Sequence, residues 1–253
     1  MSLSTDLVGR RVLVTGASSG IGAATCRSIV GGGGSVAMLA RRKELLEELR
    51  AELGERAVPV PCDVTDLAAL PIAVDQAARA LDGLDGVITV AGRSMVGSIM
   101  TGTPERWQEL INLNLLGPLT TIRHAVDHFA GEGRRDVVIV ASTGAITPMA
   151  GVGIYAATKR GLRAGFDALR LELAPAAINV SCVMPGMFDT EGLTIEGMTF
   201  DGDIPPSDIP WFAGDGGPGS AVDLADAIAF VISRPEGFSI NELVVRPTQQ
   251  LNP

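Results

Sequence analysis

Short apolar runs alternate with longer amphipathic segments along the chain. Apolar runs rich in β-branched residues predict buried strands, and apolar residues at three- or four-residue intervals predict helices. Because the two patterns alternate, the sequence predicts an α/β fold, a doubly wound parallel sheet with helices on both faces. Strands are expected at residues 11–15, 35–40, 57–62, 86–90, 136–141, 178–183 and 241–246, and helices at about 23–30, 44–53, 66–81, 104–130, 153–174 and 221–233.

Glycine and proline mark several boundaries between these elements. The run from Gly31 to Gly34 ends the first helix. Pro71 has no backbone N–H and fits poorly in a helix interior, so regular helix is expected to begin near it. Gly117-Pro118 is expected to break the long helical region. Since no interdomain linker or repeat interrupts the pattern, the 253 residues are expected to form one domain.

The charge balance narrows the classes of partner. A net charge of −9 argues against binding nucleic acid or anionic membrane surfaces, because both favour a basic face. No apolar run reaches the roughly 18 residues of a membrane-spanning helix. The N-terminus has no charged-then-apolar signal pattern, so we expect a soluble, cytoplasmic protein.

Cysteine and histidine give no sign of a metal site. Cys26, Cys62 and Cys182 have no metal-binding spacing and lie in apolar patterns, which indicates free, buried thiols in a reducing compartment. His124 and His128 have a spacing that can bind metal on a helix. Without an accompanying carboxylate motif, positions on a helix surface are the favoured interpretation and no metal is expected.

A glycine-rich turn follows the first predicted strand. The segment Gly16-Ala-Ser-Ser-Gly20-Ile-Gly22 lies between that strand and the first helix. Glycines allow close backbone approach, and a helix N-terminus offers free N–H groups and a positive dipole end. The order of strand, turn and helix therefore predicts a cradle for a pyrophosphate, although a glycine-rich turn alone is a weak signal.

The chain's single tyrosine lies four residues before a lysine. On a helix, Tyr155 and Lys159 share one face, so the ammonium is expected to lower the pKa of the phenol. A tyrosine tuned in this way can act as a general acid or base. Ser142 ends a predicted strand, where its hydroxyl can enter a cleft. Each feature also has a structural interpretation, since Tyr-x-x-x-Lys occurs by chance and a serine can cap a strand.

The residues with chemical potential all follow strand ends. In a parallel sheet those ends meet at one edge, and ligands bind where the strand order reverses. We therefore expect one site from residues scattered along the sequence. They are Gly16 to Gly22, Arg41, Asp63, Gly92, Ser142 and Pro185.

With these motifs the chain resembles the short-chain dehydrogenase/reductase family over nearly its whole length. The matching pieces are Thr15-Gly-x-x-x-Gly20-x-Gly22, Asp63, Ala91-Gly92, Asn114 in Asn114-Leu-Leu-Gly117, Ser142, Tyr155-x-x-x-Lys159 and Pro185-Gly186-x-x-x-Thr190. The resemblance implies a Rossmann-type fold, a nicotinamide cofactor and redox chemistry between a carbonyl and an alcohol on a small-molecule substrate.

The resemblance also implies roles for individual residues. Tyr155 would exchange a proton with the substrate oxygen, and Ser142 would hydrogen-bond that oxygen. Lys159 would hold the cofactor ribose, and Asn114 would support a proton-relay water near Lys159. Thr190 would bond the nicotinamide carboxamide, and Asp63 would lie by the adenine. The implied cofactor-binding residues are Gly16, Ser18, Ser19, Gly20, Ile21, Gly22, Arg41, Arg42, Asp63, Val64, Ala91, Gly92, Tyr155, Lys159, Pro185, Gly186, Phe188 and Thr190.

One segment departs from the family pattern. Where relatives usually have Asn-Asn-Ala-Gly, this chain has Thr89-Val90-Ala91-Gly92. In relatives the first asparagine braces the strands, a role that a threonine hydroxyl can partly take. Val90 removes a polar side chain near the cofactor ribose.

The end of the second predicted strand bears on cofactor preference. A fold that prefers NAD places a carboxylate there to bind the ribose hydroxyls. Ala40 occupies that position and Arg41, Arg42 and Lys43 follow. A guanidinium can bind a 2′-phosphate in a bidentate way, so we expect NADP(H), with Arg41 the main contact and Arg42 secondary. The alternative is a solvated helix start.

Residues 188–220 form a long segment that in this family covers the substrate. Its apolar residues, with Met95, Met149 and Met187, suggest a small to medium, moderately apolar ketone or alcohol. Its carboxylates, Asp201 among them, are expected to be solvated. The C-terminal Asn241-Glu-Leu-Val-Val-Arg-Pro-Thr weakly resembles a branch acting on small hydroxy acids, amino alcohols or related carbonyls.

Assembly and function class each leave alternatives. Small residues along the helix after Gly153 favour close helix pairing, so we expect a homo-oligomer, a tetramer or dimer; the same residues can instead pack within the chain. A non-catalytic nucleotide-binding regulator or scaffold of the same fold is the alternative to an enzyme, although such relatives usually lose the tyrosine or lysine. A lyase or epimerase is a third class, but those relatives normally carry a larger C-terminal part.

Overall fold

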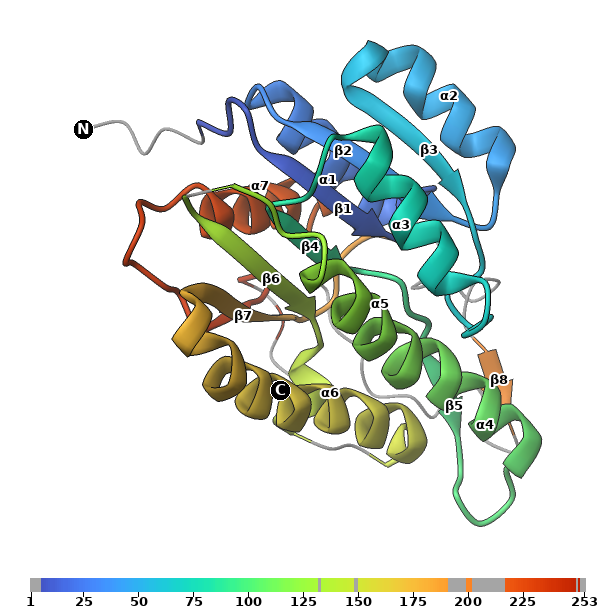
Figure 1. The fold of residues 1–253 in the computed structure, drawn as a ribbon. Coiled ribbons are helices and arrows are strands. Elements are labelled where there is room, and N and C mark those ends of the chain that lie inside the picture. The colour runs from blue at the N-terminus through green and yellow to red at the C-terminus, as the bar shows by residue number, and fades with distance from the viewer. Residues whose placement is uncertain are drawn as a thin grey trace.

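In the computed structural model, which describes residues 6–131, 133–147, 150–190, 199–201, 217–248 and 250, seven parallel strands form the central sheet (Figure 1). The strand order is β3-β2-β1-β4-β6-β7-β9, so the direction of winding reverses beside β1. This confirms the predicted fold class. The strands are β1 (Arg11–Thr15), β2 (Ser35–Ala40), β3 (Ala57–Pro61), β4 (Gly86–Thr89), β6 (Arg135–Val140), β7 (Ile178–Pro185) and β9 (Glu242–Val245).

Helices cover both faces of the sheet (Figure 1). Side chains alternate across a strand, so Leu13 of β1 packs in one core while Val12 and Val14 pack in the other. Each core is closed by the buried stripe of three helices. One face carries α3 (Leu70–Ala80), α5 (Gly117–Val126) and α6 (Gly153–Leu173), and the other carries α1 (Gly20–Gly31), α2 (Lys43–Leu53) and α7 (Ala221–Ile232).

The sequence predicted a break in the long helical region at Gly117-Pro118, but the structure shows no break there. Helix α4 (Pro104–Ile111) continues through a π-helical turn, Asn112–Leu116, directly into α5. Pro118 lies in the first turn of α5, where a missing N–H is tolerated. The irregularity is the π-helical turn, which contains Asn114, and such turns often occur at functional sites. Helix α5 ends at Val126, so His128 lies beyond it.

Pro71 has the effect that the sequence indicated. It occupies the first turn of α3, which begins at Leu70 rather than near residue 66. The first turn is the place where a helix accepts proline, because its N–H has no intrahelical partner there. Among the described residues the three cysteines are free thiols; Cys26 and Cys182 are buried, and Cys62 is partly exposed.

A second, two-stranded sheet was not predicted. The strand β5 (Met95–Gly97) pairs in parallel with β8 (Thr199–Asp201), a part of the predicted substrate cover. Gly97 permits the pairing, since a Cβ there would lie 1.9 Å from the Asp201 carbonyl oxygen. Residues 191–198 and 202–216 of that cover lie outside the described residues.

Asp201 is buried, so the expectation that it is solvated was wrong. Its Oδ2 accepts hydrogen bonds from the Thr103 backbone N–H at 2.8 Å and the Trp107 indole at 3.0 Å. Burial acts to raise the pKa of Asp201, but these bonds outweigh it and the pKa lies below its ordinary value. The carboxylate thereby fixes β8 to the start of α4.

Charged residues tie the strand starts together at the opposite edge of the sheet. The Arg10 guanidinium contacts Asp85 at 2.9 Å and Asp136 at 2.8 Å, which links β1 to the segments at β4 and β6. Arg134 binds both oxygens of Asp136, at 2.7 and 2.9 Å. It also donates to the carbonyl of Val231, in the last turn of α7. Asp136 is 1% exposed; burial raises its pKa, and its two arginine partners partly offset that effect.

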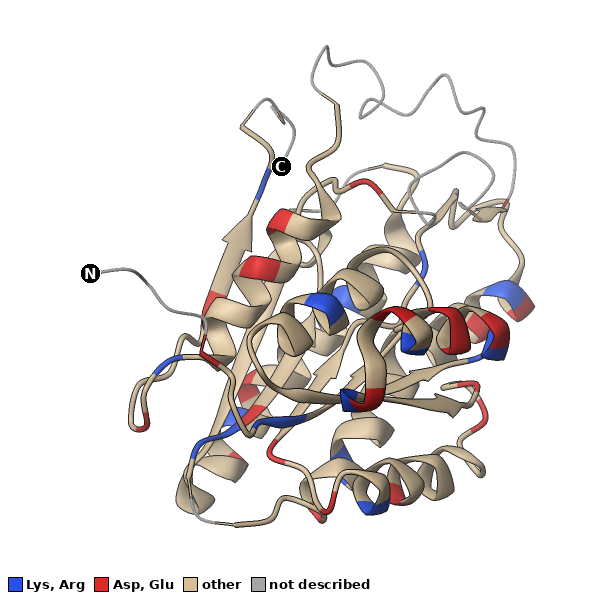
Figure 2. Cartoon of the chain, turned by 90° about the horizontal axis from the view of Figure 1, so that it is seen from above, with Lys and Arg blue, Asp and Glu red and all other residues tan. Residues whose placement is uncertain are grey.

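Over the part of the chain that is described, acidic and basic residues are mixed along the helices rather than gathered into one basic face (Figure 2). None of the helices in those ranges is long and apolar enough to cross a membrane.

The small residues of α6 divide between two environments. Gly161 and Gly165 face the preceding helical segment, since Cβ atoms there would lie 3.2 Å from the Leu115 and Leu119 side chains. Ala157, Ala164 and Ala168 are exposed. Part of the small-residue pattern therefore serves packing within the chain, and the homo-oligomer stays a prediction.

The Asp136 network generates a stability prediction. Asp136→Asn removes the carboxylate partner of the largely buried Arg134 and one of the two carboxylate partners of Arg10, and removing one partner of a buried ion pair costs about 3–5 kcal/mol. Urea unfolding should show a loss of that size. The matched control is Asp127→Asn, because Asp127 pairs with Arg123 on the surface and exposed pairs contribute about 0–1 kcal/mol. Equal losses in the two variants would contradict the assigned role.

Candidate active site

A pocket of about 130 Å³ opens at the carboxyl ends of the strands, beside the reversal of strand order. Its walls come from segments far apart in sequence, as the strand-end pattern predicted. The structure brings nine of the predicted residues to this pocket, and they are Ile21, Gly92, Ser142, Tyr155, Lys159, Pro185, Gly186, Phe188 and Thr190.

The glycine-rich turn leads to this pocket from β1. Gly16 and Gly20 have positive φ angles of 71° and 51°, which favour glycine. A Cβ on Gly22 would lie 2.2 Å from the Gly16 carbonyl oxygen, so only glycine lets α1 start against the turn. The N-cap residue Ser19 makes no side-chain cap bond, which leaves the first N–H groups of α1 available to an anion.

Ser142 lies two residues after the end of β6. Its extended backbone makes it the N-cap of a short 3₁₀ turn, and its Oγ accepts a hydrogen bond from Gly144 N at 3.1 Å. Ser142 also lines the same pocket as Tyr155, and its hydroxyl acts to lower the pKa of Tyr155. The strand-cap and site interpretations of Ser142 are therefore compatible, because the cap bond uses a lone pair of the oxygen and leaves the proton for a second partner.

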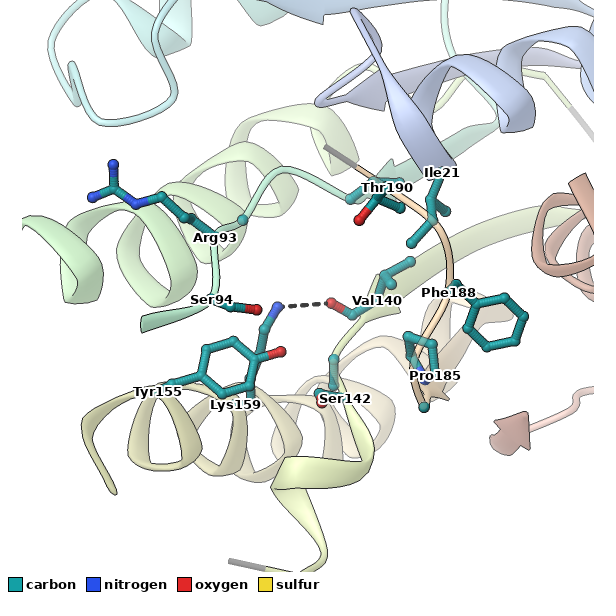
Figure 3. Close-up of a pocket in the computed structure, with 14 residues that line it drawn as sticks. Ile21, Arg93, Ser94, Val140, Ser142, Tyr155, Lys159, Pro185, Phe188 and Thr190 are labelled. Atoms are coloured by element: carbon teal, nitrogen blue, oxygen red, sulfur yellow. Dashed lines mark hydrogen bonds between the residues drawn. The ribbon is translucent and has the colours of Figure 1, made fainter. Parts of the chain in front are cut away.

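Tyr155 lies in the first turn of α6, and its hydroxyl points into the pocket (Figure 3). Burial raises the pKa of Tyr155, whereas hydrogen bonds with Ser142 and Ser94 act to lower it. The net direction is upward, which differs from the expected lowering by Lys159. The reason is distance and desolvation: the Lys159 ammonium is 5.9 Å from the centre of the Tyr155 ring.

Ser94 is a site residue that the sequence reasoning missed. Its hydroxyl enters the same pocket as that of Tyr155 (Figure 3). The residue lies just before β5, and its carbonyl accepts a hydrogen bond from Thr199 N of β8 at 3.4 Å. A serine two positions after the Ala91-Gly92 motif was the available signal, but its placement depends on β5, which was not predicted.

Lys159 extends from α6 beneath the pocket and is 5% exposed. Its Nζ donates to the Val140 carbonyl at 3.3 Å (Figure 3). Burial lowers the pKa of Lys159 to about 8. The ammonium is thus a charge with few local partners among the described residues, positioned next to the reactive hydroxyls.

Asn114 lies behind the pocket rather than in its wall. Its Oδ1 accepts from Arg93 N and its Nδ2 donates to Arg93 O, both at 2.9 Å. Nδ2 also reaches Thr158 Oγ1 at 3.2 Å. The amide thereby fixes the backbone after Gly92, where a Cβ would come within 3.3 Å of both Asn114 Oδ1 and Lys159 Nζ. The relay water that the resemblance implied stays a prediction.

Two arginines lie at the outer end of the same edge. Arg42 donates to Ser18 Oγ at 3.1 Å and to Ser19 Oγ at 2.7 Å, in the glycine-rich turn. The Arg41 side chain is 72% exposed, with Nη1 3.6 Å from Asp63 Oδ2. The side chain of Val64 packs into the core, and Ala91 packs against the same core.

Comparison with known proteins places this geometry in a family. Residues 10–196 match the short chain dehydrogenase family. The chain belongs to that family. It is therefore an oxidoreductase, and the predicted resemblance is confirmed.

Two solved structures illustrate the likeness, and the first of them is a short chain dehydrogenase. One, from Burkholderia cenocepacia in complex with NADP, is 32% identical with a TM-score of 0.82, covering 95% of this chain and 98% of that one. The other, a 3-ketoacyl-(acyl-carrier-protein) reductase from Brucella melitensis complexed with NADH, is 27% identical with a TM-score of 0.83, covering 97% and 100%.

A curated relative shares the family but not the length. The glycine betaine reductase of Emericella nidulans is 32% identical over 96% of this chain. This chain spans 19% of that protein.

The residues of this dehydrogenase fit a nicotinamide cofactor. A Cβ on Gly16 or Gly22 would fill the space that the glycine-rich turn leaves open. The N-terminus of α1 has no side-chain cap bond, which suits a pyrophosphate. The departure at Thr89-Val90 leaves the bracing intact, because Thr15 Oγ1 accepts from Val90 N at 3.1 Å and Ala91 N at 3.2 Å. Thr89 itself makes a longer contact, 3.4 Å, to the Val138 carbonyl.

Of the methionines expected near the substrate, the two that the structure describes do not line the pocket. Met95 is buried in β5 with 3% exposure, and Met187 is absent from the pocket wall within the described residues. Met149 lies outside the described residues, as do Met198, Ile204, Ile209, Trp211 and Phe212. The described wall is apolar at Ile21, Val90, Val140, Ala141 and Phe188.

The buried ammonium generates a prediction on stability and pH. The pKa of Lys159 is about 8 in the folded chain, against an ordinary value of 10.5. Below pH 8 both states carry the charge and the folded state bears its desolvation cost; between pH 8 and 10.5 the unfolded state binds more protons, so stability rises with pH. Lys159→Met should therefore stabilise the cofactor-free protein at pH 7 by about 1–3 kcal/mol, a gain reduced by the lost bond to Val140.

Chemical unfolding at several pH values tests this, and the gain should shrink as pH rises past 8. Lys43→Met is the control, because Lys43 is exposed at the start of α2. Its effect should be small and independent of pH. A Lys159→Met variant less stable than the unchanged protein at pH 7 would contradict the inferred cost.

Proposed function

We propose that this short-chain dehydrogenase is an NADP(H)-dependent oxidoreductase that interconverts a carbonyl and a secondary alcohol on a small to medium, moderately apolar substrate. The observation that carries the proposal is that the Ser142 and Tyr155 side chains and the buried Lys159 ammonium meet in one pocket. A purely structural hydroxyl pair would not need a lysine desolvated beside it, because burying a charge is costly.

When bound, the nicotinamide supplies or accepts the hydride. The residues of the chain manage the substrate oxygen. As a carbonyl carbon is reduced, negative charge develops on its oxygen, and the Ser142 and Tyr155 hydroxyls stabilise it by hydrogen bonding. Tyr155 then transfers its proton to that oxygen as general acid, and accepts a proton from the alcohol in the reverse direction.

The neighbouring groups keep Tyr155 ready for this transfer. Hydrogen bonds from Ser142 and Ser94 and the positive charge of Lys159 each favour a phenolate after the proton leaves. They oppose the effect of burial, which favours the neutral phenol. Asn114 acts at one remove, by fixing the backbone of Arg93, and thereby of Gly92 and Ser94, around the pocket.

The first test removes the proton donor. Tyr155→Phe should lower turnover by roughly 10² to 10⁴, the usual contribution of general acid catalysis, while cofactor binding is retained. Turnover is measured as oxidation of NADPH with a panel of ketones, aldehydes and keto acids. Activity within about threefold of the unchanged enzyme would remove Tyr155 from the mechanism. Turnover with no substrate of the panel would contradict the enzymatic proposal and favour a nucleotide-binding regulator.

We infer the preference for NADP(H) from the end of β2. Ala40 ends the strand without a carboxylate to bind a free ribose hydroxyl pair. The exposed Arg41 guanidinium has one distant carboxylate partner, and Arg42 already contacts the glycine-rich turn. Both lie where a 2′-phosphate would add charge-assisted bonds. The two solved relatives hold NADP in one case and NADH in the other, so the proposal rests on the residues.

The second test separates the two cofactors. Arg41→Ala should weaken NADPH binding by about 1.5–3 kcal/mol, as expected for hydrogen bonds to a charged group, and leave NADH binding little changed. Arg42→Ala should have a smaller effect. Fluorescence titration of both cofactors measures this. The control is Arg50→Ala, because Arg50 is exposed on α2, the helix that follows the two arginines. Equal or tighter NADH binding by the unchanged protein would overturn the assignment.

A further inference from the structure

A residue near the C-terminus contacts the turn that forms one wall of the pocket. The Gln250 side-chain oxygen accepts a hydrogen bond from Met187 N at 2.8 Å, across 63 residues of sequence. The same oxygen lies 2.1 Å from the position that a Cβ on Gly186 would take, and the next two atoms nearest that position, at 2.9 and 3.0 Å, also belong to Gln250. The side chain therefore covers the outer face of the Gly186–Met187 peptide.

This peptide belongs to the wall that faces the reactive groups. Pro185, Gly186, Phe188 and Thr190 line the pocket opposite Tyr155 (Figure 3). Pro185 is the last residue of β7, so the geometry of the backbone that follows it depends on other partners. Gly186 N donates to the Val245 carbonyl at 2.8 Å, and Asp189 N donates to the Gly219 carbonyl at 2.7 Å.

Gln250 supplies a further hydrogen bond to this backbone segment. The N–H of Met187 lies between those two backbone bonds, and its acceptor is a side chain rather than the backbone. Gln250 is itself held by a turn, since its N–H donates to the Pro247 carbonyl at 3.0 Å. An amide oxygen fixed in this way sets the orientation of the peptide next to the pocket, because an N–H points along its hydrogen bond.

We propose that Gln250 is a positioning residue for the nicotinamide end of the cofactor. Its side-chain oxygen holds the Gly186–Met187 peptide in the orientation that lets the following residues, Phe188 and Thr190, receive the ring beside Tyr155. The proposal rests on the proposed function, since it needs a nicotinamide cofactor in this pocket. It adds that cofactor affinity depends on a side chain that does not itself line the pocket.

The test compares a whole cofactor with its adenine half. Gln250→Met keeps the length of the side chain and removes the amide acceptor. Titration should show NADPH binding weakened roughly 3- to 10-fold, the effect of one net hydrogen bond, while adenosine 2′,5′-bisphosphate binds as tightly as to the unchanged protein. The fragment lacks the nicotinamide, so a defect confined to NADPH locates the effect at that end. Thr248→Ala is the matched control, because Thr248 is exposed in the same turn.

A second variant reaches the same contact from the other side. Gly186→Ala places a methyl group where the Gln250 amide now lies, and a flexible side chain can move away from it. Gly186→Ala should therefore reproduce the effect of Gln250→Met, and the double variant should show little additional loss. Additive losses would mean that the two changes act separately, which would overturn the proposed contact.

The remaining outcomes are also decisive. If the unchanged protein binds NADPH and Gln250→Met binds it equally well, the positioning role is wrong while the proposed function stands. If Gln250→Met weakens NADPH and the adenine fragment alike, or lowers the melting temperature without selective loss, Gln250 has a general structural role and the proposal fails. If the unchanged protein binds neither NADPH nor NADH, the proposed function fails first.

Discussion

Parallel pairing of the strands is the constraint on which the rest of this structure depends. All pairs in the central sheet run in the same direction, so every strand delivers its following residue to one edge. The reversal of order beside β1 separates the segments there and leaves room between them. The pocket lies in that space, and its chemistry is set by whichever residue follows each strand.

The two edges of the sheet treat charge in opposite ways. At the edge of strand starts, Arg10 and Arg134 enclose Asp136 and partly offset the burial that raises its pKa. At the edge of strand ends, Lys159 is also buried, but within the described ranges the acceptor of its ammonium is the Val140 carbonyl, and burial lowers its pKa to about 8. The first arrangement stabilises the fold. The second keeps an unneutralised charge beside Tyr155, which is costly for stability and suited to chemistry.

Several contacts around the pocket join residues that are remote in sequence. Asp201 is attached to the start of α4, Ser94 to Thr199, and Gln250 to Met187. Each involves a segment outside the seven-stranded sheet. Together these contacts add later segments of the chain to the carboxyl edge, where the parallel sheet places the catalytic candidates.

The sequence by itself determined the sheet, its helices and the residues that follow its strands, because periodicity and glycine placement act locally. It also indicated Pro71 as the start of α3 and the clustering of Gly92, Ser142 and Lys159. The tertiary structure decided what depends on contacts across the chain. The pairing of β5 with β8 needs Gly97 to meet Asp201, Asn114 of the π-helical turn holds the Arg93 backbone, and the net pKa of Tyr155 depends on how deeply the fold buries it. Neither a short strand nor a desolvation cost leaves a period in the sequence, so both became visible only when the segments met.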